Sequence, residues 1–132
     1  MTLSRRRFLA LVPLVLVAPR AVAMRTRKPK HPTPRPGITA ARVLTDARLT
    51  DASAAPAYAM VREIPQIVDG IRCNCGCADV AGFYSLLTCY EQGGMAQHCV
   101  ICQGQAKLAY TLHGEGWSLN GIRTAIDAQF GD

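Results

Sequence analysis

Apolar residues recur at helical spacing in the second half of the chain, and no segment alternates apolar and polar residues as a strand does. Residues 55–64 predict a short helix that tolerates Pro56 in its first turn. Pro65 ends this helix and opens another, because the apolar side chains of residues 64–71 share one helical face. The residues that follow, 73–77, are therefore expected to form a loop.

The remaining elements are also helical. Residues 82–90 predict a helical turn, and a longer helix is expected over residues 99–113. The apolar stripe of that helix comprises Ile101, Leu108 and Leu112, with Ala109 beside it. Ser118 is a good N-cap for a last helix. The predicted fold is all-α, a small bundle of four or five short helices with a cysteine-rich loop.

The N-terminus predicts export. Residues 4–10 read SRRRFLA, and the apolar run over residues 8–18 is about half the length that a membrane-spanning helix needs. Residues 21–23, AVA, provide the small side chains of a signal peptidase site. We interpret residues 1–23 as a signal peptide of the twin-arginine type, which predicts a periplasmic or extracytoplasmic protein. Membrane attachment is expected only through an uncleaved signal segment.

A flexible linker is predicted between the signal peptide and the folded domain. Residues 24–37 hold four prolines and five basic residues, a composition typical of an extended spacer. His31 lies within this spacer and is expected to be solvated. Residues 38–52 allow one or two helical turns. The prediction is therefore a linker over residues 24–52 and a cysteine-rich helical metal-binding domain over residues 53–132.

The positive charge of the chain belongs to its N-terminal part. The formal net charge is +6, from fifteen basic and nine acidic residues. Nine of the basic residues precede residue 38 and all nine acidic residues follow it, so residues 38–132 carry a net charge of −3. The folded part therefore gives no support for a nucleic-acid-binding surface.

Six cysteines carry the candidate chemistry: Cys73, Cys75, Cys77, Cys89, Cys99 and Cys102. In an extended strand, alternate thiols stand ~7 Å apart, too far to share an ion whose bonds to sulfur are ~2.3 Å long. Gly76 allows the loop to curl and bring its three thiols together. The C-x-x-C pair at a helix start places two thiols one turn apart, where the helix N-terminus stabilises thiolates. All six residues are thus candidate metal ligands.

Thiolate sulfur is a soft ligand, and this limits the metals. All-thiolate sites suit Cu(I) or Zn(II), with an iron–sulfur cluster ranked behind them, and exclude Mg²⁺ and Ca²⁺. His98 and Met95 are further donors in principle, although we expect His98 to be a solvated loop residue. The expected partners are a soft metal ion and a metal-transfer or thiol protein. No hydrolase or phosphate-binding motif is present, so the sequence gives no support for a hydrolytic enzyme, and a binding protein is favoured over an enzyme.

Two alternatives stay open at this point. In one, Cys99 and Cys102 exchange electrons with partner thiols in a periplasmic redox protein. In the other, the even cysteine count is a disulfide framework for an interaction module without metal. A disulfide within a C-x-C pair closes a short, strained ring, but three bridges to distant partners would satisfy all six residues.

The segments IRCNCGC, SLLTCY and CVICQGQAKLAYTLHGEGWSLNGIRTAID resemble bacterial proteins named for a Pro-Cys-Tyr-Cys-Gly-Cys motif. The resemblance covers residues 58–127 and fits all six cysteines. It implies an exported or lipid-anchored protein of unassigned or metal-related function. Arg72 stands where the family has Pro, Asn74 stands where it has Tyr, and the lipid-anchor cysteine is absent.

A second, weaker resemblance involves the C-x-x-C pair. CVICQGQ followed by GEGWSLNGI resembles the thiol reductases of cytochrome c maturation, which implies redox chemistry at Cys99 and Cys102. Those proteins hold one cysteine pair, so the resemblance leaves the other four thiols of this chain without a role.

Overall fold

The computed structural model describes residues 31–131, which form four α-helices and six short 3₁₀ turns and contain no strand. The helices are α1 (Ala55–Glu63), α2 (Pro65–Asp69), α3 (Val100–Gly114) and α4 (Leu119–Phe130). The turns are η1 (Ala40–Arg42), η2 (Asp46–Arg48), η3 (Ala52–Ala54), η4 (Cys77–Asp79), η5 (Leu86–Tyr90) and η6 (Ala96–His98). The prediction of an all-α fold is confirmed. The predicted signal peptide lies outside the described residues.

Local sequence signals set the helix boundaries. Pro56 lies in the first turn of α1, and Pro65 opens α2 directly after Ile64, whose backbone leaves the helical region. Ser118 caps α4 by accepting a hydrogen bond from the backbone N–H of Gly121. These boundaries agree with the prediction. Among residues 31–131, none of the helices combines the length and apolar character that crossing a bilayer requires.

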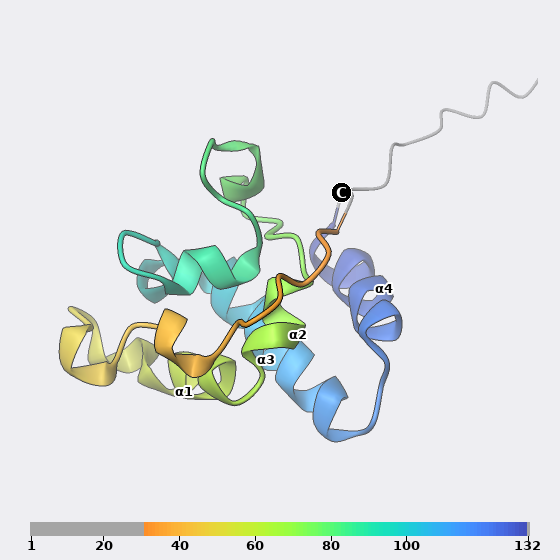
Figure 1. The fold of residues 1–132 in the computed structure, drawn as a ribbon, viewed down its shortest axis with the longest axis horizontal. Coiled ribbons are helices and arrows are strands. Elements are labelled where there is room, and N and C mark those ends of the chain that lie inside the picture. The colour runs from red at the N-terminus through yellow and green to blue at the C-terminus, as the bar shows by residue number, and fades with distance from the viewer. Residues whose placement is uncertain (1–30, 132) are drawn as a thin grey trace, which may run out of the picture.

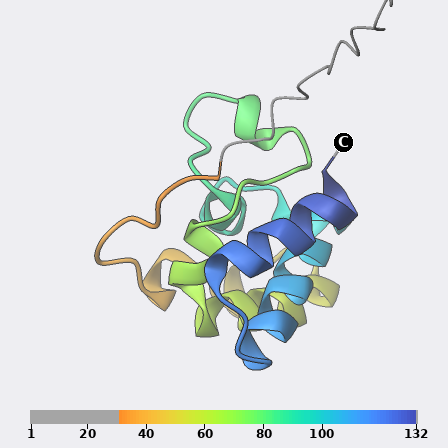
Figure 2. The ribbon, with the colours of Figure 1, turned by 90° about the vertical axis from the view of Figure 1, so that its right-hand side faces the viewer.

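Helix α3 lies at the centre of the molecule and packs against both α1 and α4 (Figure 1). Its buried residues are Cys102, Gln105, Ala106, Ala109 and Leu112. The predicted stripe is therefore wrong at Ile101, which is 38% exposed. The helix is rotated so that the thiol of Cys102 and the side-chain amide of Gln105 face inward near its N-terminal end. The loop that follows α2 stands out above this end (Figures 1 and 2).

The described part of the predicted linker, residues 31–52, packs on the helices. Residues 31–37, here called the strap, run from the end of α4 across α2 (Figure 1). The His31 side chain is only 10% exposed and contacts Asp127 of α4 at 3.0 Å. Its Nδ1 accepts a hydrogen bond from the backbone N–H of Arg72. The expectation of a solvated His31 is therefore wrong, whereas a flexible linker over residues 24–52 stays a prediction.

A buried carboxylate anchors the strap. Asp69, at the end of α2, is fully buried and accepts hydrogen bonds from the backbone N–H and the guanidinium of Arg35, both at 2.7 Å. Ser85 donates a third hydrogen bond to this carboxylate at 2.7 Å. Burial favours the neutral carboxyl, but the hydrogen bonds from Arg35 outweigh it and lower the pKa of Asp69. A buried carboxylate requires hydrogen-bond donors, and Arg35 supplies them, which explains why this proline-rich segment packs against α2.

Candidate metal centre

The cysteine-rich loop curls on itself. Its sulfur atoms lie 3.1 Å apart between Cys73 and Cys75, and 2.9 Å apart between Cys75 and Cys77. Gly76 makes the bend, because its φ of 96° lies in the left-handed region that favours glycine. The separation is less than half that of alternate side chains in a strand, ~7 Å. The curl expected from Gly76 is therefore present.

Gln105 of α3 holds the loop by its backbone. Its side-chain oxygen accepts a hydrogen bond from the N–H of Asn74 at 3.0 Å, and its amide nitrogen donates to the carbonyl of Arg72 at 3.0 Å. The residue between these two is Cys73. Gln105 is fully buried, and our sequence interpretation missed it. The available signal was its position three residues after Cys102, on the same face of the helix.

The guanidinium of Arg72 bridges the ends of the loop. It contacts Asp79 of η4 at 2.9 Å, across the three loop cysteines. The partner of its guanidinium is thus a carboxylate, and Arg72 closes the loop at the position where the family motif has Pro.

The N-terminus of α3 supplies the C-x-x-C pair. Cys99 is the N-cap, and its sulfur accepts a hydrogen bond from the backbone N–H of Cys102 at 3.3 Å. The sulfur of Cys102 points to the loop and lies 3.5 Å from those of Cys73 and Cys75. The two members of the pair therefore differ. Cys102 joins the loop thiols, whereas Cys99 caps the helix.

Cys89 approaches from η5 and is fully buried. A capping box formed by Ser85 and Thr88 starts this turn. The chain then folds closely over Cys89 at Gly94, where a Cβ would lie 2.2 Å from the Cys89 carbonyl oxygen. Next to Cys89, the hydroxyl of Tyr90 donates to the carbonyl of Cys102 at 2.8 Å. These contacts fix η5 against the start of α3.

Four sulfur atoms converge as a result. Those of Cys73, Cys75, Cys89 and Cys102, here called the four-thiol cluster, all lie within 4.8 Å of one another. In a tetrahedral site with metal–sulfur bonds of ~2.3 Å, neighbouring sulfurs stand about 3.8 Å apart. The cluster can therefore hold one tetrahedral ion with small adjustments. Three of its residues are buried and Cys75 is half-buried.

The cluster residues ionise as a group. Contacts with Cys102, Cys89 and Cys75 lower the pKa of the Cys73 thiol to about 3, against the effect of burial. The contacts with Cys73 and Cys89, together with burial, raise the pKa of the Cys102 thiol. Burial and its neighbours Cys77 and Cys73 likewise raise the pKa of Cys75. The thiolate of Cys73 is thus stabilised by the protonated thiols around it. Ionisation of a second thiol would require a cation to balance the added negative charge.

A model of the family described as proteins of unknown function with a PCYCGC motif matches residues 47–132. The chain belongs to this family. Its version of the motif is Arg72–Cys77, and the matched region includes all four residues of the cluster. No curated protein matches the chain, and no solved structure matches it.

The other candidate donors of this PCYCGC-motif protein lie at the edge of the cluster or outside it. Cys77 adjoins Cys75, and its sulfur lies 3.0 Å from Sδ of Met95. The side chain of His98 is 62% exposed and its ring contacts Thr50 and Asp51, so it is placed as the solvated residue that we expected. All six cysteines are free thiols.

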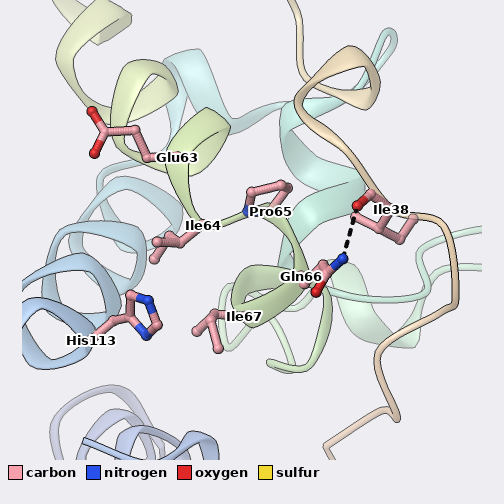
Figure 3. Close-up of a pocket in the computed structure, with 7 residues that line it drawn as sticks. All are labelled: Ile38, Glu63, Ile64, Pro65, Gln66, Ile67 and His113. Atoms are coloured by element: carbon pink, nitrogen blue, oxygen red, sulfur yellow. Dashed lines mark hydrogen bonds between the residues drawn. The ribbon is translucent and has the colours of Figure 1, made fainter. Parts of the chain in front are cut away.

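A surface cavity of about 350 Å³ lies elsewhere in this PCYCGC-motif protein, at the junction of α1 and α2 (Figure 3). It is lined by Ile38, Glu63, Ile64, Pro65, Gln66, Ile67 and His113. Gln66 donates a hydrogen bond to the Ile38 carbonyl across its rim, as Figure 3 shows. No cysteine contributes to its lining. The cavity is therefore separate from the candidate metal centre.

Proposed function

We propose that this PCYCGC-motif protein binds a soft metal ion, Cu(I) or Zn(II), through the thiolates of the four-thiol cluster. Its role would be metal handling, storage or delivery outside the cytoplasm. The observation that carries the proposal is the convergence of four sulfurs within 4.8 Å from three separate segments of the chain. Each segment is held there by its own backbone contacts.

The composition of the site supports a soft ion. Every member of the cluster is a cysteine, and hard cations such as Mg²⁺ prefer oxygen ligands. Cys73, Cys89 and Cys102 are also buried, where several thiolates without a cation would repel one another. A bound ion would compensate this charge and would cross-link the loop, η5 and α3. Such cross-links stabilise small domains whose hydrophobic cores are marginal.

The alternatives have less support. A disulfide framework would require bridges, whereas all six cysteines are free thiols. A redox pair at Cys99 and Cys102 would require both sulfurs to serve thiol exchange. Cys102 is fully buried and contacts the other three thiols of the cluster, so it is poorly placed to act with Cys99 alone.

The test is to purify the full chain without chelator and to measure bound metal and reactive thiols. We expect stoichiometric Zn or Cu, few reactive thiols, and a fall in Tm of about 10 °C or more when a chelator removes the metal. Cys73→Ser should abolish stoichiometric Zn(II) binding, whereas Cys99→Ser should retain it. Metal-free protein with three disulfides and a Tm insensitive to chelator would refute the proposal.

Export by the twin-arginine pathway is part of the proposal. It is supported by SRRRFLA and by the small residues at 21–23. Replacing Arg5 and Arg6 with Lys should retain the precursor in the cytoplasm, as measured by cell fractionation and immunoblotting. Normal export and cleavage of the double variant would contradict this assignment.

A further inference from the structure

We propose that Cys75, Cys77 and Met95 form a second metal position, selective for Cu(I), that shares the Cys75 thiolate with the four-thiol cluster. This inference rests on the proposed function and extends it from one ion to two. The starting observation is a chain of short sulfur contacts. The sulfur of Cys77 lies 2.9 Å from that of Cys75 and 3.0 Å from Sδ of Met95.

The second position is placed differently from the first. Cys77 is buried, but Met95 is 47% exposed, so the Cys77–Met95 pair lies where the cluster meets solvent. Gly76 bends the loop just before Cys77, which begins η4. Met95 precedes η6 on a different segment, after the close approach of Gly94 to Cys89. Two independently positioned segments thus bring the two donors together.

The donor set determines the selectivity. Thioether sulfur is neutral and soft, which suits Cu(I), a monovalent soft ion that accepts few ligands. Structural Zn(II) sites are instead built from four anionic thiolates or imidazoles, and the thioether of Met95 offers neither. A thiolate can bridge two metal ions, and Cys75 lies in contact with both Cys73 and Cys77. The protein should therefore hold two Cu(I) ions but one Zn(II) ion.

Because the second position is exposed, it is the place where metal would exchange with external ligands. An ion bound there is next to solvent, whereas an ion among Cys73, Cys89 and Cys102 is buried. Exchange with an external thiol or thioether ligand would then occur first at Met95. The shared Cys75 thiolate offers the inner ion a route to the outer position by exchange of sulfur ligands, with no change in oxidation state.

The test is anaerobic titration of the reduced, metal-free full chain with Cu(I) and, separately, with Zn(II), against chromophoric chelators. We expect two equivalents of Cu(I) and one of Zn(II) for the wild type. Met95→Leu preserves size and should bind one Cu(I) tightly, with the second weakened at least tenfold, and one Zn(II) as before. Cys77→Ser should behave in the same way. Met60→Leu is the matched control, because Met60 lies on α1, away from the sulfur contacts.

The outcomes separate the two proposals. One tight Cu(I) in the wild type, or two in Met95→Leu, overturns the second position and leaves the four-thiol cluster in place. Loss of Zn(II) binding in Met95→Leu also overturns it, because Met95 would then serve the first site. A wild-type chain that binds neither ion refutes both proposals. Circular dichroism of each variant confirms that the helices are retained.

Discussion

The side-chain oxygen of Gln105 accepts a hydrogen bond from the backbone N–H of Asn74 at 3.0 Å, and this contact ties α3 to the cysteine-rich loop. The same amide donates to the carbonyl of Arg72, so both polar groups of one buried side chain are used. Cys73 is fixed between the two contacts. Gln105 is therefore a positioning residue that prepares the loop for a ligand without being one.

Gln105→Leu should weaken metal binding as well as the fold. The substitution leaves the Asn74 N–H and the Arg72 carbonyl without partners, which costs roughly 1–3 kcal/mol. Loss of a group that orients a metal ligand typically lowers metal affinity about 10–100-fold. Competition with a zinc chelator and thermal unfolding measure the two effects.

Two further variants sharpen this test. Gln105→Glu keeps the acceptor for Asn74 but places a buried carboxylate against the carbonyl of Arg72, so an effect at least as large as that of Gln105→Leu is expected. Gln66→Leu is the control, because Gln66 makes one long hydrogen bond of 3.4 Å far from the cysteines. Equal metal affinity for Gln105→Leu and wild type would exclude the positioning role.

Gly94→Ala should disturb the approach of η5 to the cluster. The added Cβ would lie 2.2 Å from the Cys89 carbonyl oxygen, so the backbone must shift. Overpacking of this kind costs about 1–3 kcal/mol. Zn(II) affinity should fall together with Tm, because Cys89 moves with this backbone.

Gly114→Ala is the matched control for Gly94. Gly114 ends α3 and has open space where a Cβ would lie, so the substitution should be neutral or slightly stabilising. A Gly94→Ala protein with the Tm and Zn(II) affinity of the wild type would show that the close approach is not needed.

Arg35→Ala should detach the strap. The substitution leaves the buried carboxylate of Asp69 without its cation, and we expect a loss of about 1–3 kcal/mol, since Arg35 is itself part-exposed. For a domain of this size, that corresponds to about 4–8 °C in Tm per kcal/mol. Deletion of residues 24–37 should lower Tm at least as much.

Arg42→Ala provides the comparison for the strap. Arg42 also forms an ion pair, with Glu91 at 3.0 Å, but its side chain is 47% exposed. Its loss should change stability by less than about 1 kcal/mol. If the deletion leaves Tm unchanged, the strap contributes nothing to stability and the linker interpretation is supported.

Acid should release the strap through Asp69. The pKa of Asp69 is lowered in the folded protein from its ordinary value of 3.8, so the unfolded chain takes up the proton first as pH falls. The stabilisation is complete above pH 3.8 and is lost as pH falls through the lower folded value. Thermal unfolding of metal-free, reduced protein between about pH 6 and pH 2 measures this loss.

Asp69→Asn removes the ionisable group and should flatten this part of the pH profile. Asp46→Asn removes an exposed carboxylate, 61% accessible, and should leave the profile close to that of the wild type. A wild-type and an Asp69→Asn protein with the same loss of Tm below pH 4 would contradict the role of Asp69.

The sequence by itself determined the helix boundaries and the class of metal that the thiols favour, because both depend on residues close together in the chain. Pro65 and Ser118 act on backbone groups within one turn, so their effect is readable from the residues beside them. Gly76 likewise bends its own loop, and the softness of six cysteines follows from the sulfur atom alone. The family assignment depends on the same short motifs.

Only the tertiary structure decided which groups meet. Cys73 and Cys102 are 29 residues apart, and Arg35 and Asp69 are 34 residues apart, so their contacts depend on how the helices pack. Helical spacing predicted Ile101 in the core, but the sequence does not record the rotation of α3 that buries Cys102 and Gln105. The sequence also predicted a solvated strap, because the residues that the strap contacts are distant in the chain. Its composition lacks apolar residues, and the buried carboxylate that binds it lies on another segment.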